Sequence, residues 1–173
     1  TEVTKDWLKA LPDGKGLESR DSFTLLQDAE GNQYLYGNCY RDEESSSAHL
    51  WKEADGNALD ITPQKWLEPI DMDGYRFYDA PQYMTLTEDG LLVGLSYFSL
   101  DVVLAQDGSM VSSQESDSLI DSGTLADNKW VSAVGDTLYL AQADEQGSVN
   151  GLLQMQLDGN NGAKAKGVIP FSQ

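Results

Sequence analysis

The chain holds one histidine and one cysteine, and the sequence around neither residue indicates a catalytic role. His49 occurs in Ala48-His-Leu-Trp51, whereas a catalytic zinc takes several protein ligands, so a single histidine cannot build such a site. Cys39 cannot form an internal disulfide, and it occupies an apolar position in Tyr34-Leu-Tyr-Gly-Asn-Cys-Tyr40. We therefore expect no catalytic residue, no metal site and no cofactor, and we interpret His49 as a hydrogen-bonded or exposed strand residue.

The abundance of carboxylates does not identify an enzyme. Glycoside hydrolysis needs two carboxyl groups in one cleft, one of them with a raised pKa, and the 29 acidic residues contain no pair that the sequence distinguishes. Asp71-Met-Asp-Gly-Tyr75 and Asp158-Gly-Asn-Asn-Gly162 resemble calcium loops, but the fifth position from Asp71 is a tyrosine and the twelfth is Gln82, so turns are the better interpretation. An enzyme is not favoured; a fragment of a carbohydrate-active enzyme with catalytic carboxylates in its loops is the alternative.

Aromatic side chains are the strongest indication of a binding site. Aromatic rings beside carboxylates stack on sugars or contact peptides, and exposed rings favour interfaces. A long aromatic insertion, residues 63–81, interrupts the regular part of the chain, and long ordered connections often carry function. For each ring the alternative is packing in the core between sheets. The predicted ligand-binding residues are Trp51, Trp66, Tyr75, Phe77 and Tyr78.

Short apolar segments separated by glycine turns must position these residues. Alternating apolar and polar positions predict strands, and Asp-Gly pairs predict tight turns between antiparallel strands. Turn glycines recur at Gly56, Gly108 and Gly159, 52 and 51 residues apart, and each is preceded by a less regular turn, at Gly31, Gly90 and Gly135. The pattern predicts one all-β module, residues 1–173, with units at about 20–62, 82–113 and 129–168 and an ordered insertion at 63–81 packed on the sheets.

Two of these units share a sequence pattern. It runs through Glu88-Asp-Gly-Leu-Leu-Val93 and Val103-Leu-Ala-Gln-Asp-Gly108, and again through Val134-Gly-Asp-Thr-Leu-Tyr139 and Met155-Gln-Leu-Asp-Gly159. This pattern resembles that of bacterial extracytoplasmic β-propeller proteins with degenerate blades, over roughly residues 20–170. The resemblance implies an all-β fold of about three four-stranded antiparallel propeller-like units. Because propellers close with at least four blades, it also implies an incomplete propeller, further domains or self-association; a β-sandwich is the alternative fold.

The charge of the 173-residue chain excludes several partners. There are 29 acidic and 11 basic residues, a net charge of −18, which repels nucleic acids and anionic lipid surfaces. No apolar run is long enough to cross a bilayer, so we expect no direct membrane insertion. The sequence starts at Thr1 without a signal peptide, as a trimmed mature protein or an excised piece would.

These observations predict a non-enzymatic repeat module that binds its target through loops and exposed aromatic residues. The resemblance implies a secreted or lipid-anchored bacterial surface protein, and therefore an extracytoplasmic location, with a protein or a carbohydrate as the partner. A purely structural spacer is a further alternative. The predicted core positions are Leu25, Leu35, Leu50, Leu86, Leu92, Val103, Val131, Leu138, Leu140, Leu153 and Met155.

Overall fold

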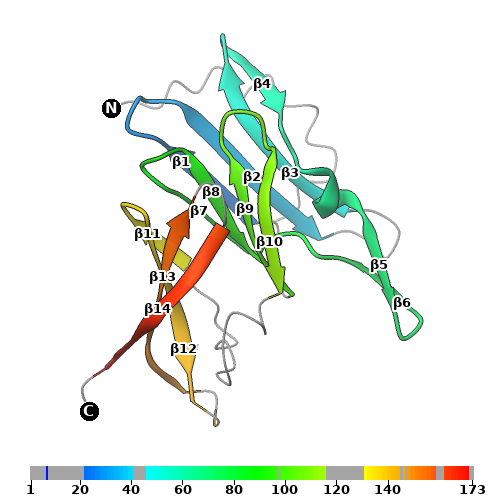
Figure 1. Ribbon diagram of the computed structural model, residues 1–173. Coiled ribbons are helices and arrows are strands. Elements are labelled where there is room, and N and C mark those ends of the chain that lie inside the picture. Colours follow the sequence, from blue (N-terminus) through cyan, green and yellow to red (C-terminus); the bar gives the residue numbers. More distant parts are fainter. Residues whose placement is uncertain are drawn as a thin grey trace. The chain divides into compact units, whose positions relative to one another are not determined.

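The protein is built from β-strands that follow one another along the chain as antiparallel neighbours (Figure 1). The computed structural model describes Trp7 and residues 22–40, 46–96, 98–115, 131–144, 146, 148–158 and 162–171. The chain divides into two compact units, Thr1–Ala80 and Pro81–Gln173.

The first unit contains a four-stranded sheet in which the strands lie in sequence order. Its strands are β1 (Ser22–Gln27), β2 (Gln33–Tyr40), β3 (Ser46–Ala54) and β4 (Asn57–Asp60). Tyr36 pairs with Leu50 on one face of the sheet, and Leu35 pairs with Trp51 on the other. Both pairs are buried, so this sheet carries apolar side chains on each of its faces.

The insertion after β4 forms a short helix and a separate hairpin. The helix is the 3-10 turn η2 (Gln64–Leu67), and the hairpin pairs β5 (Pro69–Met72) with β6 (Tyr75–Tyr78). Asp73 and Gly74 both have positive φ, at 54° and 82°, which is the backbone of a type I′ turn. The Asp-Gly pair therefore forms the tight hairpin that its sequence predicts.

The second unit contains two four-stranded antiparallel sheets, each again in sequence order. The first sheet comprises β7 (Tyr83–Leu86), β8 (Leu91–Leu95), β9 (Ser99–Leu104) and β10 (Met110–Glu115). The second comprises β11 (Val131–Val134), β12 (Thr137–Ala143), β13 (Val149–Asp158) and β14 (Gly162–Pro170).

These two sheets pack face to face around one hydrophobic core. The first sheet contributes Val93 and Val102, and the second contributes Leu138, Leu140 and Met155, among others. Each fully buried aliphatic side chain of this kind stabilises the fold by roughly 1.5–3 kcal/mol. The core therefore depends on alternate residues of adjacent strands.

The predicted fold class is confirmed: the structure is all-β and contains three four-stranded antiparallel sheets. Each sheet uses four strands that are consecutive in the chain, which is the construction of a propeller blade. A β-sandwich of immunoglobulin type distributes its strands between two sheets instead.

Most predicted core positions are buried. Leu35, Leu50, Leu92, Val103, Leu138, Leu140, Leu153 and Met155 are all buried, and Leu86 is half-buried. The prediction is wrong for Leu25, which is exposed, because it lies on the edge strand β1, where the sheet offers a neighbour on only one side. The side chain of Val131 lies outside the described part of the chain.

Candidate functional site

The two tryptophans predicted to bind a ligand lie inside the first unit. Trp66, on η2, is fully buried, and its ring meets that of Tyr36 edge to face, with centroids 5.6 Å apart. Trp51, on β3, is buried with Trp7 and Leu35. Neither indole presents a face to solvent as a stacking platform would, so both stabilise the core of this unit.

The hairpin β5–β6 has the opposite character, because every residue from 68 to 76 is exposed. The exposed fractions are 38% for Ile70, 47% for Met72 and 70% for Tyr75. The expectation that the insertion packs on the sheets is therefore correct for Trp66 and wrong for the hairpin. Each strand of the hairpin has only four residues, so few side chains at its base can pack on the sheet, and the outer half of the hairpin stays exposed.

The register of the hairpin places its apolar residues on one face. Met72 pairs with Tyr75, and Ile70 pairs with the backbone of Phe77. Since residues two apart in a strand share a face, Ile70, Met72 and Tyr75 lie together. The side chain of Phe77 lies outside the described part of the chain, and that of Tyr78 is half-buried at the base of the hairpin.

The other face of the hairpin is polar. Asp71 pairs with Arg76 across the strands, and Arg76 Nε donates a hydrogen bond to Asp71 Oδ1 at 3.0 Å. Both side chains are exposed, so this ion pair adds little stability. Its two charged side chains lie on the face opposite the apolar one. We call Ile70, Met72 and Tyr75 the hairpin face.

An ion pair anchors the base of the hairpin. Lys65, on η2, places its Nζ 3.8 Å from Oδ2 of Asp79, the residue that follows β6. Asp79 is buried, and a buried carboxylate is costly unless a cation or hydrogen-bond donors compensate its charge. The contact therefore ties both ends of the insertion together while the tip projects into solvent.

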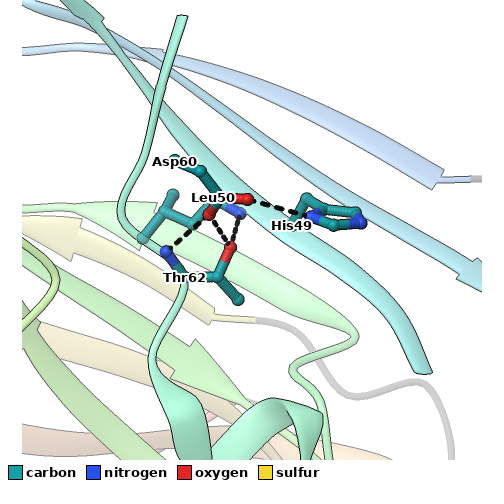
Figure 2. A network of polar contacts seen from close by, with 4 residues as sticks. All are labelled: His49, Leu50, Asp60 and Thr62. Carbon is teal, nitrogen blue, oxygen red and sulfur yellow. Dashed lines mark hydrogen bonds and ion pairs between the residues drawn. The ribbon is translucent and has the colours of Figure 1, made fainter. Parts of the chain in front are cut away.

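The single histidine belongs to a polar network at the end of β4 (Figure 2). His49 Nδ1 lies 3.3 Å from Asp60 Oδ2, and the imidazole stacks on Trp51 with centroids 4.9 Å apart. The backbone N–H of Thr62 donates to Asp60 Oδ1 at 2.9 Å, and the Thr62 hydroxyl accepts from the backbone N–H of Leu50 at 2.8 Å. The network continues the edge of the sheet beyond β4 and directs the chain toward η2.

The electrostatics of this network do not suit acid catalysis. The hydrogen bond from His49 and those from Thr62 hold the pKa of Asp60 at about 2, despite the opposing effect of partial burial. A general acid requires a carboxyl pKa raised toward neutrality. Thr62 donates its hydroxyl proton to Asp60 and not to His49, so these three residues do not form a nucleophile–histidine–aspartate triad. The interpretation of His49 as a hydrogen-bonded strand residue is confirmed.

Among the described residues, no group of three or more histidine, cysteine, aspartate or glutamate side chains is arranged to hold a metal ion. Within the same part of the chain, no helix is long and apolar enough to cross a membrane. Cys39 lies in β2 as predicted, and its side chain is outside the described part.

Comparisons with known proteins give one structural similarity. No protein-family model matches the chain, and no curated protein matches it. A solved structure that is similar is the extracellular domain assigned to a hybrid two-component system of B. thetaiotaomicron, with a TM-score of 0.49 and 15% sequence identity. The similarity covers 84% of this chain and 16% of that one, so the chain spans about a sixth of that structure. A similarity of this size says nothing about a shared ligand or partner.

Proposed function

We propose that this chain is a non-enzymatic binding module of an extracytoplasmic bacterial protein, and that it docks a protein partner on the hairpin face. The observation that carries the proposal is the exposure of three large apolar side chains, Ile70, Met72 and Tyr75, side by side on one face of an anchored hairpin. Scattered exposed apolar residues are ordinary, whereas grouped ones with a polar reverse face mark interaction surfaces. Tyrosine and methionine are also enriched at protein interfaces.

The size and shape of the hairpin face favour a protein over a sugar. Its residues come from two short strands and a tight turn, so they form a convex projection and not a pocket. A two-stranded hairpin is marginally stable in water, and covering its apolar face would stabilise it. A protein groove supplies that cover, whereas a sugar ring covers only one aromatic side chain.

Charge favours a basic partner. The chain carries a net charge of −18, and Glu68 and Asp73 flank the hairpin face as exposed acidic residues. A second copy of the chain would bring like charges together, which opposes self-association through this face. We therefore infer a partner surface that combines apolar side chains with lysine or arginine, whose association slows as ionic strength rises.

Site-specific photo-crosslinking tests the proposal. A photoreactive phenylalanine analogue replaces Tyr75 in one protein and Val134 in a second, and each is irradiated with the envelope fraction of the cells that make the chain. Val134 is the matched control because it is an apolar residue, 67% exposed, beside a tight turn outside the hairpin. We expect one protein to crosslink at position 75 and not at position 134, through an apolar segment flanked by basic residues. Crosslinks that are the same at both positions, or only to copies of this chain, would overturn the proposal.

A further inference from the structure

A pocket of about 460 Å³ opens at one end of the β11–β14 sheet. The end of β12, the start of β13 and the end of β14 meet there. Small-molecule sites have volumes of about 300–1,000 Å³. The residues that line the pocket are Gln142, Asp144, Ser148, Val149, Asn150, Val168, Pro170 and Phe171.

One wall of the pocket carries hydrogen-bonding groups with spare capacity. Asp144 Oδ1 accepts hydrogen bonds from the backbone N–H groups of Gln146 and Ser148, at 3.0 and 2.9 Å, which holds the carboxylate in place, and Oδ2 makes no hydrogen bond to a described residue. The side-chain amides of Gln142 and Asn150 make no hydrogen bond to any described residue. Two amides, a carboxylate oxygen and the Ser148 hydroxyl thus supply both donors and acceptors.

Asn150, which lines the pocket, lies at a β-bulge. Gln142 pairs with Gly151 and Ala143 with Val149, so Asn150 is an extra residue in β13. Bulges are common beside functional sites, where they redirect a side chain. The carbonyl oxygen of Asn150 accepts a hydrogen bond from the backbone N–H of Phe171 at 2.9 Å, which fixes the bulge against the end of β14.

Gly151 allows β14 to approach the bulge closely. A Cβ at this position would lie 2.8 Å from the carbonyl oxygen of Ile169 and 3.3 Å from the Cα of Pro170. The close approach brings the end of β14 against the pocket as an apolar wall, made of Val168, Pro170 and Phe171. The pocket is therefore polar on one side and apolar on the other.

This arrangement selects a class of ligand. None of the described residues that line the pocket is a lysine or an arginine, so this lining offers no cation for a phosphate or another anion. Asp144 is the one carboxylate among the described lining residues, and one carboxylate does not meet the oxygen-ligand count that calcium requires. A neutral saccharide has hydroxyl groups that both donate and accept, together with an apolar C–H face that packs on aromatic and aliphatic side chains. We propose that this pocket binds a neutral mono- or disaccharide, with Asn150, Gln142 and Asp144 on its hydroxyl groups and Phe171 against its C–H face.

The proposal is independent of the hairpin face, which lies in the first unit and shares no residue with the pocket. The test is calorimetric and NMR titration of the full chain with a panel of neutral saccharides at tens of millimolar, and with putrescine as a cationic probe. Asn150→Asp is the main variant, because it keeps the size and shape of the side chain while it replaces the amide donor with an acceptor oxygen and a negative charge. Gln142→Ala removes the second amide. Gln156→Ala is the matched control, since Gln156 lies at the other end of β13 and reaches the carbonyl oxygen of Asp136.

We expect at least one neutral saccharide to bind with millimolar affinity, and each pocket variant to weaken binding roughly 3- to 10-fold, as the loss of one hydrogen bond implies. The Gln156→Ala protein should bind like the parent. The proposal is overturned if no neutral saccharide binds, if putrescine alone binds, or if Asn150→Asp and Gln142→Ala leave saccharide affinity unchanged while their circular dichroism spectra match that of the parent.

Discussion

Replacing Trp66 by alanine separates the aromatic residues that build the first unit from those that are free to bind a partner. Trp66 is fully buried on η2 and meets Tyr36 edge to face. Its loss leaves a cavity and removes the ring contact, which together cost about 3–5 kcal/mol of unfolding free energy. Since domains are stable by only about 5–15 kcal/mol, the variant should lose a large part of its stability.

Urea unfolding followed by far-UV circular dichroism measures this loss. The Trp66→Phe variant retains most of the apolar contact and should lose less than Trp66→Ala. Tyr75→Ala is the surface control: its side chain is 70% exposed, so the free energy of unfolding should change by less than about 0.5 kcal/mol. The reasoning is refuted if Trp66→Ala stays within about 1 kcal/mol of the parent, or if Tyr75→Ala is equally destabilising.

Two other predictions concern the pH dependence of stability in the first unit and the packing of side chains within the second. The pKa of Asp60, about 2, lies below its ordinary value of 3.8, so its contribution to stability is present above pH 4 and is lost as the pH falls toward 2. Because the side chain is half-exposed, that contribution is at most about 1 kcal/mol. An NMR titration of the Asp60 carboxyl group with a midpoint near 3.8 would contradict the prediction. So would an Asp60→Asn protein with the same acid sensitivity as the parent. A Cβ at Gly94 would lie 2.5 Å from Cγ of Pro81, so Gly94→Ala should lower the free energy of unfolding by about 1–3 kcal/mol, and a urea midpoint unchanged from the parent would show that Pro81 moves freely.

The strands and turns of this chain could be predicted because their signals are local. Asp55-Gly56 and Asp73-Gly74 adopt positive φ at both positions, as Asp-Gly pairs do in tight antiparallel turns. Leu138 and Leu140 alternate with Thr137 and Tyr139 and are buried. Residue type and a period of two were enough to identify these features.

Burial of individual side chains could not be predicted from the same signals. Leu25 has the spacing of a core residue, yet it lies on an edge strand, and position within a sheet depends on pairings far along the chain. Trp66 and Tyr75 belong to one aromatic insertion, but the first is fully buried and the second is mostly exposed. The alternation of Ile70, Met72 and Tyr75 about the Asp-Gly turn was the available signal for the hairpin face.

The pocket of the β11–β14 sheet could not be predicted from the sequence for a different reason. One of its polar residues, Asn150, lies at a one-residue bulge, which exists only relative to the partner strand β12. Gln142 and Phe171 are 29 residues apart and meet only because β12 and β14 end at the same side of the sheet. Nothing local distinguishes these residues from the other polar and apolar positions of the last unit.

The affinity of the crosslinked partner for the chain tests the hairpin face most directly. The purified partner is titrated with the parent chain, with Tyr75→Ser and with the control Val134→Ser. We expect Tyr75→Ser to weaken binding about 30-fold, as the loss of an interface tyrosine at the centre of a contact does, and Val134→Ser to bind like the parent. Equal affinities for all three proteins would show that the partner docks elsewhere and would contradict the assignment of the hairpin as the binding surface.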